Sequence, residues 1–247
     1  MVLQLTNRLL FIQDHEDDVD SLLVLESPYD NELKEDCPCV GKSGLSMSKA
    51  LLQKDCAVSF SKVLRDGCDY LNIAKRYALF DTFKFPIDEN IAGKLDVNSE
   101  SLWNCETTPW KKIKITDNAI GKELSRKREN TGTYDRVCHY KTLIQTMDGI
   151  EPNRLNSFLN EYKCDLIKTI LKFRSLKQIV FCGFIAQSVF LKAFSKPYDR
   201  VPYRTNFRFK RDGIVLRFVE HPSRANKRDD CPPWRFTPRS KKILLLA

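Results

Sequence analysis

The stretch DSLLVLE, residues 20–26, is a short apolar run that ends in a carboxylate and is followed by Ser27 and Pro28. A continuous apolar run that stops at a turn predicts a buried β-strand. Loops that follow such strands often hold functional residues. The sequence therefore directs attention to Glu26 and to the residues after it.

Similar runs recur along the chain. KRYALFDTFKFP, residues 75–86, predicts a second strand that ends by Pro86, and KQIVFCGF, residues 177–184, predicts a third buried strand. Residues 204–223 predict a hairpin that turns at Asp212-Gly213.

Helical periodicity separates these strands, over residues 45–64, 152–174 and 184–195, with Pro152 suited to a first turn. Strands that alternate with helices predict an α/β fold, here a single domain built as a three-layer α/β/α sandwich with a central, mostly parallel sheet. Ligands of such sheets bind at the carboxyl ends of the strands, which are the places of Glu26 and His221.

Residues 87–150 are polar and charged and show weak periodicity. They hold Trp103, Trp110 and the basic stretch 122–128. We expect an insertion or lid here.

The composition is that of a globular protein with an uneven charge distribution. The chain has 247 residues, of which 42% are hydrophobic, 11% aromatic and 30% charged, enough for one ordinary core. The net charge is +9, yet residues 1–40 hold two basic and ten acidic side chains, whereas residues 204–247 hold twelve basic and four acidic ones. A nucleic-acid face is therefore expected toward the C-terminal part.

Nine cysteines, an odd number, include no C-x-x-C pair and no grouped histidine. This spacing fits reduced thiols better than a disulfide framework or a zinc site, so we expect no metal and no cofactor. No run approaches the roughly 18 apolar residues of a membrane span, and the first residues lack the basic start and the long apolar core of a signal peptide. We expect a soluble, cytoplasmic monomer, associated with the nucleoid if the protein is bacterial, and no membrane partner.

Gly41-Lys42-Ser43 lies between a strand and a helix, as a phosphate-binding loop would. The glycine that this loop requires five residues earlier is Asp36, whose charge opposes phosphate binding, and Pro38 removes a backbone donor. A helix start that Ser43 caps is the better interpretation.

The stretch LVLESPYDNELKEDCPCVGKSG, residues 23–44, resembles the first motif of the uracil-DNA glycosylase superfamily. In the iron-sulfur branch that motif reads roughly G-E-x-P-G, an acidic residue, then G-x-P-F-V-G-x-S-G. The residues that match in order and with compatible spacing are Glu26, Pro28, Glu32, Pro38, Val40, Gly41, Ser43 and Gly44.

EHPSRANK, residues 220–227, looks like the second motif of the same superfamily, H-P-S followed by the segment that enters the DNA minor groove. In the single-strand-selective branch an Arg and then A-N-K follow, which Arg224 to Lys227 resemble with a shorter spacing. IVFCGFIAQ, residues 179–187, is similar to the strand and glycine turn that the superfamily places before its next helix. The three segments bracket residues 20–228, nearly the whole chain.

Hydrolysis of an N-glycosidic bond builds positive charge on the sugar and negative charge on the departing base. A site for this reaction needs a carboxylate near the sugar and a hydrogen-bond donor near the base, which Glu26 and His221 would supply. The resemblance implies that Glu26 positions water or stabilises the oxocarbenium-like state, with Asp30 in reserve, and that His221 donates to a base carbonyl. Alternatively, Glu26 is a solvated charge at the end of a strand and His221 is a residue of a turn. The other two histidines, His15 and His139, are interpreted as structural.

The departures from the motif concern the base pocket. Tyr29 stands where the uracil-specific branch has a tyrosine that crowds position 5 of the base, so it is expected to gate the pocket, and Ser27 is expected to line the pocket as well. The aromatic residue that stacks on the base is replaced by Cys39. A wider pocket follows, unless Phe83 or Trp234 supplies the ring.

The asparagine that reads the uracil edge is missing from the end of the second strand, where Phe80 and Asp81 stand. Phe80 is a further candidate for the stacking ring. An ionised Asp presents acceptors alone, so Asp81 suits an amino-bearing base edge better than uracil. The four cysteines that hold the cluster of the iron-sulfur branch are also missing, so no cluster is expected.

Contacts with DNA are expected from the C-terminal part. Arg224 is the candidate wedge that holds the gap of a flipped nucleotide, because the leucine of the uracil-specific branch aligns with Ala225. The basic residues of this part could equally form a solvated face of the hairpin. The residues expected to contact DNA, together with Ser43 from the first motif, are Ser223, Asn226, Lys227, Arg228, Arg204, Arg208, Lys210 and Arg211. The basic stretch 122–128 is a second, weaker candidate.

The sequence therefore predicts a monofunctional DNA glycosylase that removes uracil or a modified pyrimidine and leaves an abasic site, in repair or in attack on modified foreign DNA. We expect a monofunctional enzyme because no lysine of either motif stands at a plausible position for Schiff-base chemistry. The alternative is an inactive module of the same fold that binds DNA or a repair partner, and a nucleotide hydrolase ranks third.

Overall fold

Three central strands of the sheet are buried at every residue, and the helices pack on them. The structure is a computed structural model in which the described residues are 9–26, 32, 38–52, 56–66, 70–83, 120–121, 124, 136–196, 204–205, 213–219 and 221. Its strands are β1 (Leu9–Phe11), β2 (Ser21–Leu25), β3 (Tyr77–Asp81), β4 (Gln178–Cys182), β5 (Arg204–Thr205) and β6 (Val215–Val219). Its helices are η1 (Glu16–Asp18), α2 (Lys42–Leu51), α3 (Phe60–Asp66), α4 (Leu71–Ala74), α8 (Arg136–Asp148), α9 (Pro152–Lys172) and α10 (Phe184–Ala193).

The strands form one mixed sheet in the order β1-β3-β2-β4-β6-β5. The pairs β2·β3, β2·β4 and β4·β6 are parallel, and the outer strands β1 and β5 pair antiparallel with β3 and β6. The fold is therefore α/β with a mostly parallel centre, as the sequence predicts. The strands expected within residues 20–26, 75–86 and 177–184 are confirmed.

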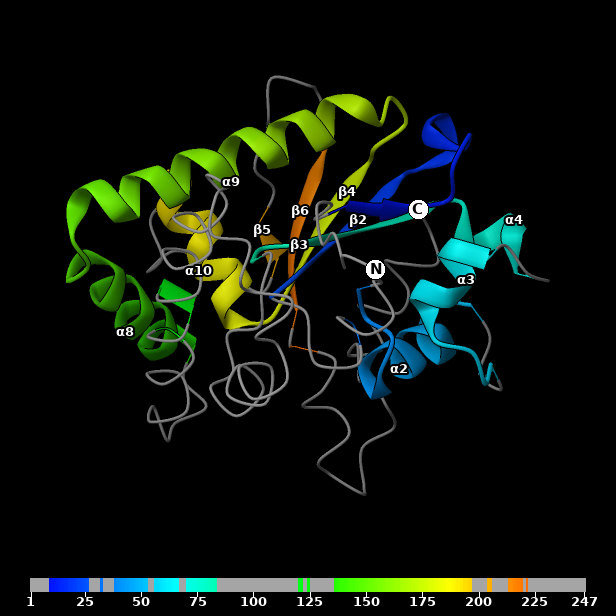
Figure 1. Ribbon diagram of the computed structural model, residues 1–247, viewed down its shortest axis with the longest axis horizontal. Helices are drawn as coiled ribbons and strands as arrows, with labels where there is room; N and C mark the ends of the chain where they lie inside the picture. Colours follow the sequence, from blue (N-terminus) through cyan, green and yellow to red (C-terminus); the bar gives the residue numbers. More distant parts are fainter. Residues whose placement is uncertain are drawn as a thin grey trace, which may run out of the picture.

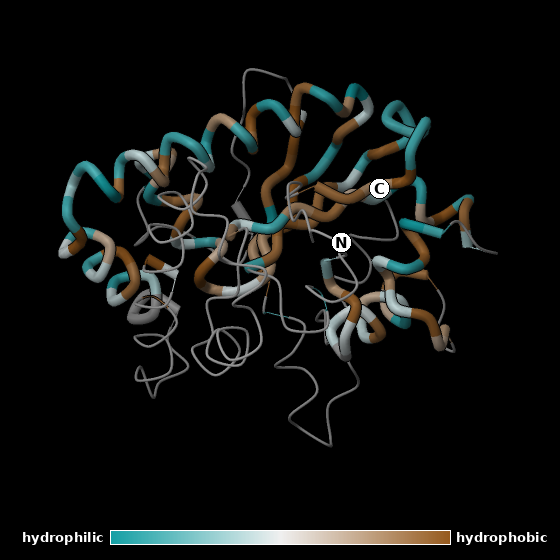
Figure 2. Tube along the Cα trace, viewed as in Figure 1, coloured by the Kyte–Doolittle hydropathy of each residue, from teal (hydrophilic) through white to brown (hydrophobic). Residues whose placement is uncertain are grey.

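Helices cover both faces of this sheet, an arrangement compatible with a three-layer sandwich (Figure 1). Side chains of β2 alternate between the layers: Leu22 and Val24 belong to the buried cluster shared with α8, α9 and α10. Leu23 and Leu25 belong to the second cluster, shared with α2 and α3. The central strands are mostly apolar, whereas α9 alternates between hydrophobic and hydrophilic residues (Figure 2), as expected for a helix with one solvent-facing side.

The structure corrects two expectations about the elements. The helical pattern over 45–64 belongs to two helices, α2 and α3. Part of the expected insertion is helix α8, which packs on α10 and places Tyr140, Leu143 and Met147 in the core. The antiparallel pair of the expected hairpin is confirmed, with Arg204 opposite Arg217, whereas Asp212 of its expected turn lies outside the described residues.

Candidate functional site

The parallel strands reverse their order beside β2. The chain passes from β2 to β3 on one side of it, and β4 and then β6 follow on the other side. In an open parallel sheet the crevice for ligands lies at such a switch point, outside the carboxyl ends of the two strands. Glu26 and Gly183 are the first residues beyond the ends of β2 and β4, so the topology alone places Glu26 at the expected ligand position.

Glu26 is held at this position by two neighbouring segments. Its backbone carbonyl accepts a hydrogen bond from the Phe83 N–H at 3.0 Å, just beyond β3. Its Oε1 accepts one from the Ile185 N–H at 3.1 Å, in the first turn of α10. The first N–H groups of a helix have no partner within the helix and lie at the positive end of its dipole, so they stabilise a negative charge. The carboxylate is 2% exposed.

Gly183 makes this close approach possible. It has φ of +97°, and a Cβ atom at this residue would lie 2.3 Å from Glu26 Oε1. A side chain here would be strained by the backbone conformation and would collide with the carboxylate. The neighbouring thiol of Cys182 is inert, because burial, with the Glu26 charge beside it, raises its pKa far above the usual range.

His221 lies at the same edge of the sheet, just beyond β6, and is 8% exposed. The end of β6 is tied to the β4–α10 turn, because the Gly183 N–H donates to the Val219 carbonyl at 2.9 Å. One strand, β4, separates β2 from β6. Since neighbouring strands lie about 4.8 Å apart, the ends of β2 and β6 are about 10 Å apart. The structure therefore brings the two predicted catalytic residues to one edge, with Gly183 between them.

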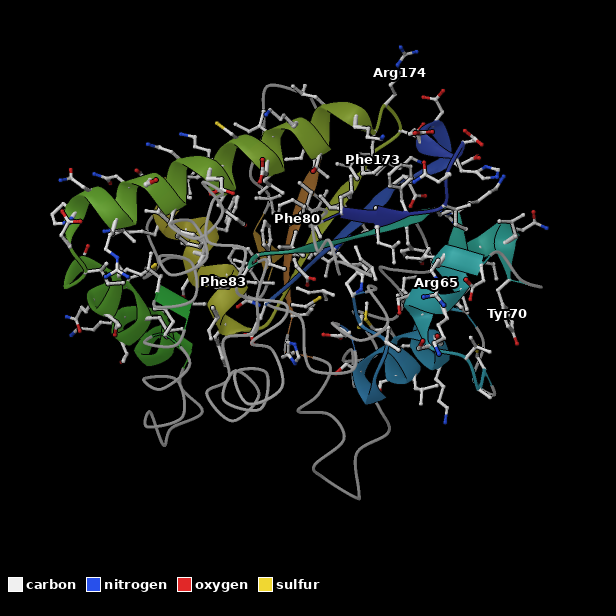
Figure 3. All side chains as sticks on the ribbon, viewed as in Figure 1. Arg65, Tyr70, Phe80, Phe83, Phe173 and Arg174 are labelled. Atoms are coloured by element: carbon white, nitrogen blue, oxygen red, sulfur yellow. The ribbon has the colours of Figure 1, made fainter. Side chains whose placement is uncertain are left out.

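The remaining pocket candidates lie differently. Asp81, the last residue of β3, is 7% exposed and pairs in register with Leu25, so it shares the edge with Glu26. Phe80 and Phe83 belong to the core on the α9 side of the sheet (Figure 3), where Phe80 packs edge-on against Tyr162. Phe83 stacks on a core ring as well, so neither residue offers a free face to a base from this position.

The loop before α2 also differs from expectation. Cys39 has φ of +63° and is buried in the cluster with α2 and α3, where its Sγ donates to Met47 Sδ at 3.0 Å. It therefore fills the core rather than widening a pocket. Ser43 does not cap α2: the helix begins after Gly41, and Ser43 lies within its first turn.

The other predicted site residues lie outside the described residues. These are Ser27, Tyr29, Asp30, Ser223, Arg224, Asn226, Lys227 and Arg228. The alternative ring Trp234 and the hairpin residues Arg208, Lys210 and Arg211 lie outside them as well.

Near the amino ends of the strands, polar residues form a different kind of cluster. Asp20 accepts hydrogen bonds from Arg76 Nε at 2.8 Å and from Ser21 Oγ at 2.7 Å. Gln178 Nε2 donates to Ser21 Oγ at 2.8 Å, and Arg217 Nε donates to Gln178 Oε1 at 2.8 Å. These groups satisfy one another across β2, β4 and β6, which is the arrangement of a structural network.

Two residues that the sequence interpretation left out lie beside the candidate site. Gln187 of α10 is 1% exposed and donates to the Val219 carbonyl, and Tyr140 of α8 donates to Gln187. The available signal was a glutamine within the otherwise apolar run FIAQSVFL, residues 184–191. A polar side chain in a buried helix must find hydrogen bonds, so its presence predicts a specific contact.

Within the described ranges no group of three or more His, Cys, Asp and Glu residues could hold a metal ion. In the same part of the chain no helix combines the length and the apolar character needed to cross a membrane. Comparison of the chain with protein-family models finds no match, and comparison with curated proteins finds none either.

Proposed function

We propose that this protein is a monofunctional DNA base glycosylase with a fold like that of uracil-DNA glycosylases. The observation that supports this most is the position of Glu26 at the switch point of the sheet, held against α10, with His221 at the same edge. The motif resemblance and the excess of basic residues over 204–247 support DNA as the partner. The product is an abasic site.

The chemistry is hydrolysis of the bond between the sugar C1′ and the base. As that bond breaks, the sugar becomes cation-like, and the Glu26 carboxylate stabilises this charge and orients the attacking water. The hydroxide portion of water bonds to C1′, and its remaining proton ends on the departing base. His221 donates a hydrogen bond to the base carbonyl, where the negative charge develops. The target nucleotide must first leave the base stack, at a cost of a few kcal/mol.

The substrate class is uracil or a modified pyrimidine. Asp81 shares the edge with Glu26, and a carboxylate offers acceptors only, which favours an amino-bearing base edge. A screen of DNA with diverse base modifications, read by alkaline cleavage at abasic sites, identifies the base.

The mechanism is tested with Glu26→Gln and His221→Ala, each of which is expected to slow base release by about 100-fold or more. The amide introduced by Glu26→Gln keeps an oxygen that can accept the Ile185 N–H, so this variant removes charge while conserving the contact to α10. The control is His15→Ala, because His15 contacts Asp18 of η1 and lies before β2 rather than at its carboxyl end. Unchanged rates of base release in both variants would contradict this mechanism.

A second candidate is an inactive module of the same fold that binds DNA or a repair partner. It is favoured by one observation: the Glu26 carboxylate accepts an N–H at the start of α10, a structural task that requires no catalysis. This candidate predicts salt-sensitive DNA binding that Glu26→Gln leaves unchanged, and no abasic product from any base tested.

A further inference from the structure

The side chain of Gln187 links three segments that meet behind the candidate site. Its Nε2 donates to the Phe181 carbonyl of β4 at 2.9 Å and to the Val219 carbonyl at the end of β6 at 2.7 Å. Its Oε1 accepts the hydroxyl hydrogen of Tyr140, with 2.5 Å between the oxygens. The amide thus uses both of its N–H groups and its oxygen, which fixes its orientation.

The hydrogen bond from Gln187 to Val219 holds the end of the strand that precedes His221. Val219 is the last residue of β6, two residues before His221, and its carbonyl also accepts the Gly183 N–H. The turn that contains Gly183 continues into the Ile185 N–H that binds Glu26. One short segment, residues 183–187, therefore contacts the carboxylate of one candidate and the backbone that leads to the other.

Tyr140 connects this segment to α8. It is completely buried, and its ring packs edge-on against Phe184, with centroids 5.7 Å apart. Its hydroxyl supplies the donor for Gln187 Oε1. The two carbonyls that accept from Nε2 set which way the amide faces, because an amide turned by 180° would place its oxygen against both of them.

We infer that Gln187, with Tyr140, is a positioning residue that fixes the direction in which the end of β6 presents His221 toward Glu26. This inference rests on the proposed glycosylase function. It assigns α8 a task in that function: the helix anchors the hydrogen-bond chain from Tyr140 through Gln187 to Val219.

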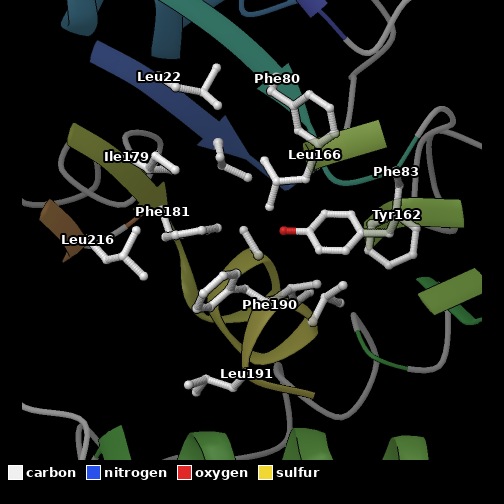
Figure 4. Packing of buried hydrophobic residues seen from close by; sticks show 14 of the residues in the cluster. Leu22, Phe80, Phe83, Tyr162, Leu166, Ile179, Phe181, Phe190, Leu191 and Leu216 are labelled. Atoms are coloured by element: carbon white, nitrogen blue, oxygen red, sulfur yellow. The ribbon is translucent and has the colours of Figure 1, made fainter. Parts of the chain in front are cut away.

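The test is Tyr140→Phe, which retains the ring and its packing and removes only the hydroxyl that donates to Gln187. The matched control is Tyr162→Phe on α9. Tyr162 is also completely buried, and its hydroxyl points into the apolar cluster beside Phe181 and Phe190 (Figure 4). Both variants lose a buried phenolic oxygen from the same layer, so Tyr162→Phe controls for the loss of that atom without loss of the hydrogen bond to Gln187.

Tyr140→Phe is expected to lower the single-turnover rate of base release by about tenfold, the effect of about one hydrogen bond, while DNA affinity stays unchanged. In the His221→Ala background the same substitution is expected to cause no further loss, because residues that act through one another are not additive. Tyr162→Phe is expected to leave the rate unchanged in either background. Equal losses from Tyr140→Phe in both backgrounds would overturn the inference and leave a structural role only.

A second measurement does not depend on activity. The chain has three histidines, so the ring resonances of His221 can be assigned by single substitution of the other two. Tyr140→Phe is expected to shift the His221 resonances, and Tyr162→Phe is not. If the wild-type protein releases no base but the resonance shift is present, the proposed function is wrong and the positioning of His221 by Gln187 and Tyr140 is retained. If the shift is absent, the inference about this positioning is wrong.

Discussion

Gly183 is the residue on which the geometry of Glu26 depends, and a second glycine provides the means to show it. Gly183 and Gly213 have almost the same positive φ, +97° and +98°. A Cβ atom at Gly213 would meet nothing within 4 Å, whereas one at Gly183 would collide with the Glu26 carboxylate. Substitution of Gly213 therefore measures the cost of backbone strain alone, whereas substitution of Gly183 measures the same strain together with the steric clash against Glu26.

Gly213→Ala is expected to lower the free energy of unfolding by about 1–3 kcal/mol, the cost of a strained backbone conformation. Gly183→Ala is expected to lower the free energy of unfolding by ~1–3 kcal/mol more than Gly213→Ala does, because the added methyl group must displace the Glu26 carboxylate or the turn. Urea denaturation of both variants measures the difference. Equal losses would show that Glu26 can move away from α10 without cost, and that its contact with Ile185 is dispensable.

The sequence identifies those residues of the candidate site whose signal is local. Glu26 and His221 follow apolar runs, and the carboxyl ends of parallel strands meet at one edge of a sheet. It does not identify Gln187 and Tyr140, because their roles come from a contact between residues 47 positions apart. It also misplaces Phe80 and Cys39, since which side of the sheet or loop a residue faces depends on register and on backbone conformation rather than on its position in a motif.

At the scale of elements, the sequence predicts the long and strongly patterned ones. The stripe over 152–174 becomes α9 with Pro152 at its first turn, and the central strands are confirmed. Strand β1 is missed because three residues cannot display a period. Helix α8 is missed because its buried Tyr140, Leu143 and Met147 are diluted by Lys and Thr residues in a segment whose polarity suggests a loop.

The start of α9 provides a pH-dependent test. The Glu151 carboxylate accepts the N–H groups of Asn153 and Arg154 at 2.9 and 2.8 Å. These two hydrogen bonds hold the pKa of Glu151 below its ordinary value of 4.5. Because the pKa is lowered on folding, the carboxylate stabilises the folded state above pH 4.5, and this contribution is lost as the pH falls through the lowered value.

Glu151→Gln is therefore expected to lower the Tm at pH 7, because a neutral amide is a weaker acceptor for the helix N-terminus. The difference from the wild-type protein is expected to shrink as the pH falls below 4.5. Thermal melting of both proteins from neutral to acidic pH measures it. A gap that stays constant across this range would show that charge at this position contributes nothing to α9.

At the scale of the whole molecule, one sheet is shared by two buried clusters. Leu22 and Leu23 are adjacent in β2, yet they face different helical layers. Loosening either layer therefore exposes a face of the same strands. Because both clusters share these strands, we expect the described elements to unfold together rather than layer by layer.

A pair of leucines tests whether α8, which lies in the segment expected as an insertion, belongs to this cooperative unit. Leu143 of α8 is completely buried, whereas Leu171 of α9 is 62% exposed. Leu143→Ala is expected to lower the free energy of unfolding by about 2–5 kcal/mol, and Leu171→Ala by less than about 0.5 kcal/mol. Hydrogen exchange distinguishes a shared core from an attached lid: in a shared core, Leu143→Ala lowers the protection of the β2 amides by the same free energy. Protection of β2 that remains at the wild-type level would make α8 an independent unit, and a helix that opens without the sheet could not hold Gln187 and the end of β6 in place.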